Sequence, residues 1–196
     1  MAKTIITLGR EYCTGGRYIA EDVANALGIK LYDKELITMA AKHSGLSEEA
    51  VAASEKRHTH SLLYSLYTMG NELPLGDQVF ILQSRIIKQL AEEGPCVILG
   101  RCADEILREA GMESLNVFIH ADAVHRAVRA SELTGCTDAT ELQKIIAKKD
   151  NSRHTYYNHY TGKKWGDSHN YHLVLDSGKL GYSLCTKLII EAAKGE

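Results

Sequence analysis

Residues 5–20 read IITLGREYCTGGRYIA, the pattern of a buried β-strand, a glycine-containing turn and the start of an amphipathic helix. The helix is predicted over residues 15–28, with Ile19, Val23 and Leu27 at four-residue spacing and Gly28 as its C-terminal glycine. This order places free backbone N–H groups and the positive end of a helix dipole beside a loop. We therefore expect the loop to bind a phosphate group.

The composition is that of an ordinary globular chain. It has 196 residues, 44% hydrophobic and 24% charged, which is enough for one α/β domain over residues 1–196. The 23 Lys and Arg balance 25 Asp and Glu, so nucleic acid and anionic membranes are not the expected partners. Five scattered cysteines without a CxxC pair fit reduced thiols. With no room for a signal peptide before the first strand and no membrane-length apolar run, we expect a cytoplasmic protein.

Strands and helices alternate along the chain, which implies a parallel sheet connected by right-handed crossovers. Strands are predicted over 4–8, 29–32, 96–99, 116–120 and 171–175. Helices are predicted over 34–42, from 47, and over 61–73, 77–93, 103–110, 122–133, 138–150 and 179–193. The periodicity fails over 153–170, which we interpret as a lid or arm. The predicted organisation is a core of about 1–32, 95–135 and 171–196, a helical insert of about 33–94 and a lid of about 136–170.

In a doubly wound parallel sheet, the ligand lies outside the carboxyl ends of the strands. The residues that follow the predicted strands include Arg10, Glu11, Asp33, Gly100, Arg101, His120 and Asp122. The aperiodic segment and the helix before it add Lys148, Lys149, Asp150, Arg153, Lys163 and Lys164. Arginines and lysines thus outnumber carboxylates around the expected ligand site at the strand ends, although the net charge of the chain is only −2. This local excess indicates a phosphorylated ligand, because arginine binds phosphate oxygens bidentately.

Four segments together carry a resemblance to a known family. They are the first strand with its loop, YDKEL (32–36), GPCVILGR (94–101) and YTGKKWG (160–166). Over nearly the whole chain they resemble the cytidylate kinase-like family of P-loop proteins. The resemblance implies a three-layer α/β P-loop kinase fold with a five-stranded parallel sheet, a helical substrate-binding insert and a lid. It also implies ATP as phosphoryl donor, Mg²⁺ as cofactor, and CMP or dCMP as the default acceptor.

The phosphate loop departs from the standard pattern G-x-x-x-x-G-K-S/T. With Gly15 as the second glycine, the first glycine falls on Arg10, the lysine on Gly16 and the hydroxyl residue on Arg17. The backbone of residues 13–17 still offers N–H groups to a phosphate, and Arg10, Arg17 or a lid arginine is the candidate for the missing charge. Thr14 is the nearest hydroxyl for a metal. The predicted ATP-binding residues are Arg10, Cys13, Thr14, Gly15, Gly16 and Arg17.

The acceptor motifs of the family are partly retained. Cytidylate kinases carry Asp-Ser/Thr-Gly after the second strand, an arginine further on, and Gly-Arg-Asp after the central strand. This chain keeps Asp33, Gly100 and Arg101, but has Lys34, Met39 and Cys102 at the other positions. Asp104 is the candidate for the lost carboxylate, so Asp33, Arg101 and Asp104 are the predicted acceptor-binding residues. The predicted lid residues are Lys149, Asp150, Arg153 and Lys163, and Lys149-Asp150 with Arg153 is similar to the family's Arg-Asp…Arg arrangement. The predicted catalytic residues are Arg17, Arg101 and Arg153.

The leading hypothesis is therefore an ATP-dependent small-molecule kinase of the nucleoside monophosphate type. The missing loop lysine prompts one alternative, a non-catalytic nucleotide-binding or regulatory protein on a kinase fold. The altered segment 33–39 prompts another, a kinase for a non-nucleotide metabolite. Aromatic and basic residues alternate over 153–172, but without a basic domain they do not predict nucleic-acid binding. The helix over 77–93 offers a surface for a homodimer.

Overall fold

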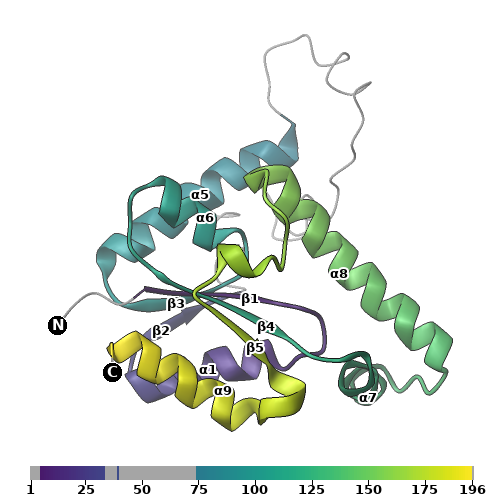
Figure 1. Cartoon of the computed structure of the whole chain (residues 1–196). Coiled ribbons are helices and arrows are strands. Elements are labelled where there is room, and N and C mark those ends of the chain that lie inside the picture. The colour runs from purple at the N-terminus through teal and green to yellow at the C-terminus, as the bar shows by residue number, and fades with distance from the viewer. Residues whose placement is uncertain (1–4, 34–38, 40–73, 196) are drawn as a thin grey trace.

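The computed structural model describes residues 5–33, residue 39 and residues 74–195. In this part of the chain the strands are β1 (Ile5–Arg10), β2 (Lys30–Tyr32), β3 (Cys96–Leu99), β4 (Leu115–His120) and β5 (Leu173–Asp176). They form a five-stranded parallel sheet in the order β2-β3-β1-β4-β5 (Figure 1). The parallel sheet predicted from the strand–helix alternation is confirmed.

Helices cover both faces of the sheet and make a three-layer architecture (Figure 1). One face carries α1 (Gly16–Leu27) and α9 (Ser177–Lys194), and the other carries α5 (Leu75–Glu93) and α6 (Ala103–Glu109). Beyond the carboxyl ends of the strands lie α7 (Ala123–Thr134) and α8 (Ala139–Thr161). The short 3₁₀ helix η1 (Ser168–Asn170) precedes β5.

The two faces of the sheet form two hydrophobic clusters because side chains alternate along each strand. Ile6 and Leu8 of β1 point to the α1 and α9 side, where they pack in a fully buried cluster with Ile19. Ile5 belongs to the opposite cluster, with Ile87 and its neighbours on α5. All four residues of β3 are buried, as expected for a central strand that is covered on both faces. Burial on both faces fixes the strand register, and the register positions the strand ends.

The register brings the functional strand ends to one edge. Leu8 of β1 pairs with Leu99 of β3, and Tyr32 of β2 pairs with Ile98. Arg10 at the end of β1, Asp33 after β2 and Gly100–Arg101 after β3 therefore meet at the same edge of the sheet, as the sequence predicts.

The main difference from the sequence prediction is the length of α8. A helix was expected over 138–150, but α8 continues to Thr161, and Gly162 ends it with φ 66°. Its last turns bury tyrosines against α5, since Tyr160 stacks on Phe80 at 3.9 Å between ring centroids. Tyrosines count as half-polar in a periodicity analysis, which is why the helical pattern was missed. The bounds of the other described elements differ from prediction by at most two residues.

The helices predicted over 34–42, from 47 and over 61–73 lie outside the described residues, apart from Met39, which packs against the cluster of α5 and α6. Within the described ranges, no helix combines the length and the apolar content needed to cross a membrane.

Candidate functional site

The loop between β1 and α1 has the backbone geometry of an anion-binding turn. Gly15 has φ 71°, and a Cβ there would lie 2.1 Å from the ring of Tyr182 on α9, so glycine is required both by conformation and by space. No acidic residue lies in the first turn of α1, and Gly15 offers no side chain to cap it. The first N–H groups of a helix have no partner within the helix. They are therefore available to an anion at this loop.

Thr14 and Cys13 contribute structure to the loop. The Thr14 hydroxyl donates to the carbonyl of Glu11 at 2.9 Å, and the Ser177 hydroxyl donates to the carbonyl of Thr14 at 2.7 Å. Thr14 is only 2% exposed, so its hydroxyl lies inside the loop and not at its mouth. Burial raises the pKa of the Cys13 thiol, which favours packing over reactivity.

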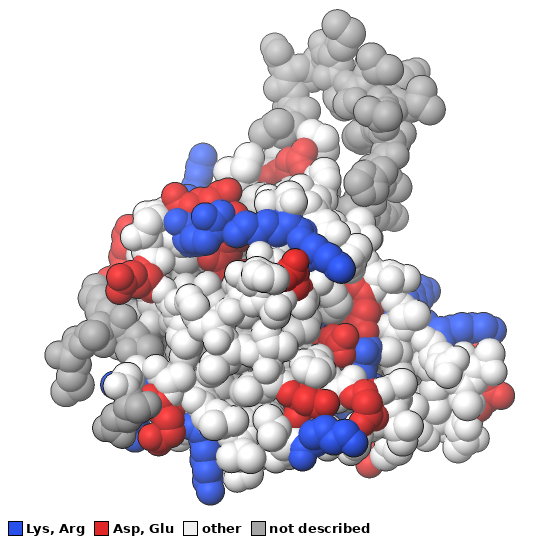
Figure 2. Space-filling model, viewed as in Figure 1, with Lys and Arg blue, Asp and Glu red and all other residues white. Residues whose placement is uncertain are grey.

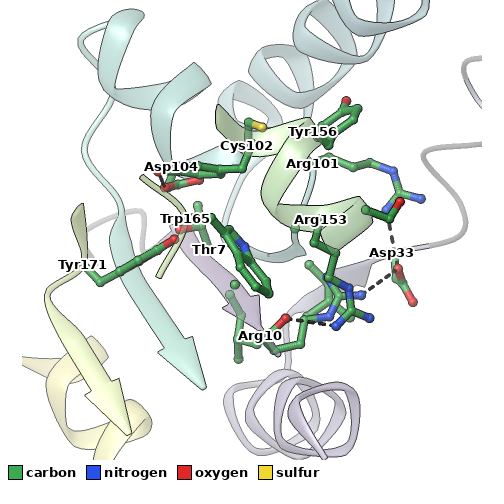
Figure 3. Close-up of a pocket in the computed structure, with 16 residues that line it drawn as sticks. Thr7, Arg10, Asp33, Arg101, Cys102, Asp104, Arg153, Tyr156, Trp165 and Tyr171 are labelled. Atoms are coloured by element: carbon green, nitrogen blue, oxygen red, sulfur yellow. Dashed lines mark hydrogen bonds and ion pairs between the residues drawn. The ribbon is translucent and has the colours of Figure 1, made fainter. Parts of the chain in front are cut away.

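Four arginines gather at the mouth of the site, and we call Arg10, Arg17, Arg101 and Arg153 the arginine cluster. Figure 3 shows three of them, Arg10, Arg101 and Arg153. The first three surround Asp33, with N–O distances of 3.9 Å, 3.5 Å and 3.5 Å respectively. Arg153 of α8 donates from Nη1 to the carbonyl of Arg10 at 3.1 Å. Arg153 also pairs with Asp150, with 3.7 Å between Nη1 and Oδ1. Positive charge thus exceeds negative charge at this mouth.

Burial is the main influence on the pKa of two of these arginines. Burial, and then the neighbouring Arg153, lower the pKa of Arg10 to about 9, although Asp33 acts in the opposite direction. Burial also lowers the pKa of Arg153. A lowered pKa means that the positive charge is unfavourable where it stands. A bound anion would relieve that cost.

Behind the arginine cluster lies a cavity of about 210 Å³ (Figure 3). The cavity is lined by Arg10, Arg101, Arg153 and Asp33 and by aromatic side chains from α8 and the segment after it: Tyr156, Tyr157, Trp165 and Tyr171. We call these four aromatic side chains the aromatic compartment.

The aromatic compartment is held in place by a buried carboxyl group. Tyr157 donates its hydroxyl to Asp104 Oδ2 at 2.7 Å, and Tyr171 hydrogen-bonds with Tyr157. Burial raises the pKa of Asp104, and this effect outweighs the hydrogen bond from Tyr157. Trp165 packs edge-to-face on Phe118 at 5.3 Å between ring centroids. These contacts fix the aromatic side chains that line the cavity.

The predicted site residues are thus divided by the structure. Arg10, Asp33, Arg101, Asp104 and Arg153 line the same cavity. Arg17 lies at its rim, with 46% of the side chain exposed, and pairs with Glu21 at 2.9 Å as well as with Asp33.

Two predicted lid residues lie apart from this cavity. Lys149 is exposed and lies over the ring of Tyr12 at 5.9 Å, and Lys163 pairs with Glu105 at 2.7 Å. Neither lysine is among the described residues that line the cavity.

Arg126 is the residue at this site that the sequence analysis missed. It lies on α7, donates to the carbonyl of Tyr12 and to Glu11 Oε2, each at 2.9 Å, and pairs with Asp150 of α8. Asp150 in turn accepts the backbone N–H of Tyr12 at 2.7 Å. Arg126 therefore ties the phosphate loop to α7 and α8. No local pattern in the sequence marked it, because its contacts arise from the packing of α7 and α8 around the loop.

A second hollow of about 420 Å³ lies on the phosphate loop. Cys13 and Thr14 form one wall, Val124 and Val128 of α7 another, and Tyr182 of α9 contributes to the rim. Both valines are largely exposed, at 73% and 58%. The hollow thus offers apolar surface beside backbone N–H groups.

The parallel sheet, the glycine loop between its first strand and helix, and the cations at its strand ends fit the P-loop kinase class. A solved structure of an uncharacterized protein from Eubacterium ventriosum is similar, with 27% identity, TM-score 0.74, and coverage of 99% of this chain and 100% of that one. Shikimate kinase from Bacteroides thetaiotaomicron (14% identity, TM-score 0.56, coverage 98% and 99%) shares the fold. A gluconokinase from Sinorhizobium meliloti (14%, 0.52, 98% and 94%) shares it too.

The sequence matches the cytidylate kinase-like family over residues 5–179, and the chain belongs to that family. The family resemblance stated from the sequence is therefore confirmed. A search of curated proteins gave no match. Family and fold together support a small-molecule kinase.

Proposed function

We propose that the protein transfers the terminal phosphoryl group of ATP to a nucleoside monophosphate, with CMP or dCMP as the favoured acceptor. The observation that carries the proposal is the arginine cluster at the mouth of an aromatic cavity, beside a helix N-terminus that is open to an anion. Both the donor and the acceptor in such a reaction carry phosphate groups. A site for them needs more cations than a site for a neutral acceptor.

The donor side of the proposed site is the phosphate loop with its adjoining hollow. The N–H groups at the start of α1 would hold the donor phosphates. The hollow lined by Val124, Val128 and Tyr182 gives apolar contact for a flat base. In this proposal the ATP base would lie on the α7 and α9 side and its phosphates at the loop.

The acceptor side is the cavity behind the arginine cluster. Arg101 and Arg153 would bind the acceptor phosphate, and the base would stack among Tyr156, Tyr157 and Trp165. Asp104 is already engaged by Tyr157, so its second role would be to accept a hydrogen bond from an amino group on the base. An amino-bearing base such as cytosine fits that requirement.

The residues would act by positioning and by charge. An oxygen of the acceptor phosphate attacks the terminal phosphorus of ATP, the bond to the bridging oxygen breaks, and ADP leaves with that electron pair. Guanidinium groups spread positive charge over the transferring group as the bond breaks. The first turns of α8 and the preceding segment, within the lid range 136–170, are the part proposed to close over the nucleotides, because the last turns of α8 are packed against α5.

Among the residues that the structure describes, no dedicated Mg²⁺ site is formed. The Thr14 hydroxyl is occupied by the Glu11 carbonyl, and in residues 5–33, 39 and 74–195 no three His, Cys, Asp or Glu side chains gather in a metal-binding group. A magnesium ion that accompanies ATP would then be held chiefly by the phosphates of the nucleotide.

Charge on the surface supports a small-molecule ligand over nucleic acid. On the face shown in Figure 2, the basic and acidic residues that the structure describes are interspersed, without one broad basic field. The net charge of −2 agrees with this. The arginine cluster is thus a local concentration of positive charge that suits a small anion.

Specific observations also favour two alternative functions. Gly16 in place of the loop lysine favours a nucleotide-binding protein without turnover. The shikimate kinase and gluconokinase among the structural neighbours are named for non-nucleotide substrates, which makes a metabolite kinase the other alternative.

An assay of ADP release separates these functions. ATP with Mg²⁺ is incubated with each nucleoside monophosphate, with shikimate and with gluconate. CMP or dCMP is expected to raise ADP release above the acceptor-free rate, and Arg101→Met is expected to lower it at least about tenfold. Arg85→Met, at an exposed position on α5, is the matched control and should leave the rate unchanged. ADP release only with shikimate or gluconate, or with no acceptor, would refute the nucleotide proposal.

A further inference from the structure

The side chain of Arg10 occupies the space in which a lysine of the standard phosphate loop would begin. A Cβ on Gly16 would lie 2.7 Å from Cβ of Arg10 and 3.0 Å from its Cγ. These atoms belong to the base of the Arg10 side chain, so they cannot swing away as the end of a long side chain can. Gly16 is not a positive-φ residue, and its backbone does not require glycine. It is the space taken by Arg10 that leaves no room for a side chain at position 16.

The far end of Arg10 is accommodated by a second glycine. A Cβ on Gly100 would lie 2.5 Å from Nη1 of Arg10. Gly100 follows β3, whereas Gly16 begins α1. The Arg10 side chain therefore runs from the start of α1 to the turn after β3, with its guanidinium among Asp33, Arg101 and Arg153. It reaches from the donor loop to the acceptor side.

The other candidates for the missing cation are placed differently. Arg17 lies at the rim of the site, where it pairs with Glu21 and with Asp33 and is 46% exposed. Arg153 comes from α8 and contacts the backbone of Arg10. Arg10 has 20% of its side chain exposed and lies between the loop and the cavity.

We propose that Arg10 replaces the lysine of the phosphate loop, binding donor phosphates from the end of β1, and that Gly16 is glycine to make room for it. This inference rests on the proposed kinase function and deepens it. Compared with the standard loop, the positions of the first glycine and of the cationic residue are exchanged. The cationic residue is at position 10 and the glycine is at position 16. The planar guanidinium can bind two phosphate oxygens at once, which a lysine cannot.

The test measures binding of inorganic pyrophosphate by isothermal titration calorimetry. Arg10→Met keeps most of the volume of the side chain and removes its charge, and is expected to weaken binding by about tenfold or more. Arg17→Met is expected to weaken it less. Gly16→Ala should also weaken binding, because the added methyl group displaces Arg10, whereas Asn25→Ala on the exposed side of the same helix should not. Circular dichroism of each variant checks that it is folded.

A paired substitution gives a second, independent readout. Gly16→Lys alone should weaken pyrophosphate binding, since it collides with Arg10. In the Arg10→Gly background the same lysine should restore affinity, because both glycines and the lysine of the standard loop then stand at their usual positions. Wild-type affinity in Arg10→Met, a loss no larger than that of Arg17→Met, or no gain from Gly16→Lys in the Arg10→Gly background overturns the inference.

These outcomes are separable from those of the proposed function. Pyrophosphate binding that depends on Arg10, together with no ADP release on any acceptor, would refute kinase activity and leave the role of Arg10 in anion binding. ADP release that is unaffected in Arg10→Met would refute the role of Arg10 alone. Absence of pyrophosphate binding by the wild-type protein would also overturn the inference about Arg10.

Discussion

Replacing Arg126 with methionine should destabilise the protein strongly, although Arg126 lies outside the cavity. Its side chain is 11% exposed, and it is bonded to Glu11, Asp150 and the carbonyl of Tyr12. The variant leaves both carboxylates without this partner. Removing one partner of a fully buried ion pair costs about 3–5 kcal/mol. Because Glu11 is 26% and Asp150 16% exposed, we expect about 2–4 kcal/mol.

Thermal unfolding monitored by circular dichroism measures this cost. For a chain of this size the expected loss corresponds to a decrease in Tm of roughly 5–15 °C. Arg129→Met is the matched control on the same helix: its ion pair with Glu132 is more exposed, and the expected cost is below about 1 kcal/mol. In an Asp150→Asn background, Arg126→Met should cost less, since one of its carboxylate partners is already neutral. A Tm decrease no larger than that of Arg129→Met would show that Arg126 does not hold the loop to α7 and α8.

Three further predictions concern the aromatic compartment. Tyr157→Phe should lower the free energy of unfolding by about 1–3 kcal/mol in urea denaturation, because Asp104 loses a hydrogen-bond donor, and an unchanged unfolding midpoint would contradict this. Burial raises the pKa of Asp104, so ionisation of Asp104 disfavours the folded state. The difference in Tm between Asp104→Asn and the wild type should therefore become more positive as the pH increases from 4 to 7. A decrease in that difference would mean that the hydrogen bonds to Asp104 outweigh its burial. Trp165 is the single tryptophan and lines the cavity, so saturating CMP should change the fluorescence emission, and an unchanged spectrum would place CMP elsewhere.

Most of the sheet and its helices could be predicted because their signals are local. Continuous apolar runs such as 96–99 mark a strand covered on both faces, and the strand–helix alternation determines parallel pairing. The second half of α8 could not be predicted in this way. Its buried face includes Tyr156 and Tyr160, whose partners are on α5, and Tyr157, which bonds to Asp104 of α6. The burial of a tyrosine is not visible in a local pattern.

The site residues divide for a similar physical reason. Arg10, Asp33 and Arg101 lie at or just after the carboxyl ends of adjacent strands, so the topology brings them together once the strands are recognised. Arg126 was missed because its contacts with Glu11 and Asp150 depend on the packing of α7 and α8 around the loop. That packing follows from tertiary structure, and no spacing in the sequence encodes it.

Composition also assigned some residues to the site that the structure places in other contacts. Lys163 was chosen as one basic residue among several, but its ammonium group pairs with Glu105. Thr14 was chosen as the nearest hydroxyl, and its hydroxyl instead bonds within the loop. The sequence identifies which residues are charged or polar near the site, whereas the orientation of each side chain depends on its neighbours.

The central claim is that the protein phosphorylates a nucleoside monophosphate, and the most direct measurement is mass spectrometry of the acceptors themselves. ATP and Mg²⁺ are incubated in one reaction with equal concentrations of CMP, dCMP, UMP, AMP and GMP. We predict that CMP or dCMP is converted first to a product heavier by one phosphoryl group, at a rate that falls at least about tenfold in Arg101→Met. No phosphorylated product from any of the five nucleotides, at a protein concentration at which ATP binding is detected, would contradict the claim.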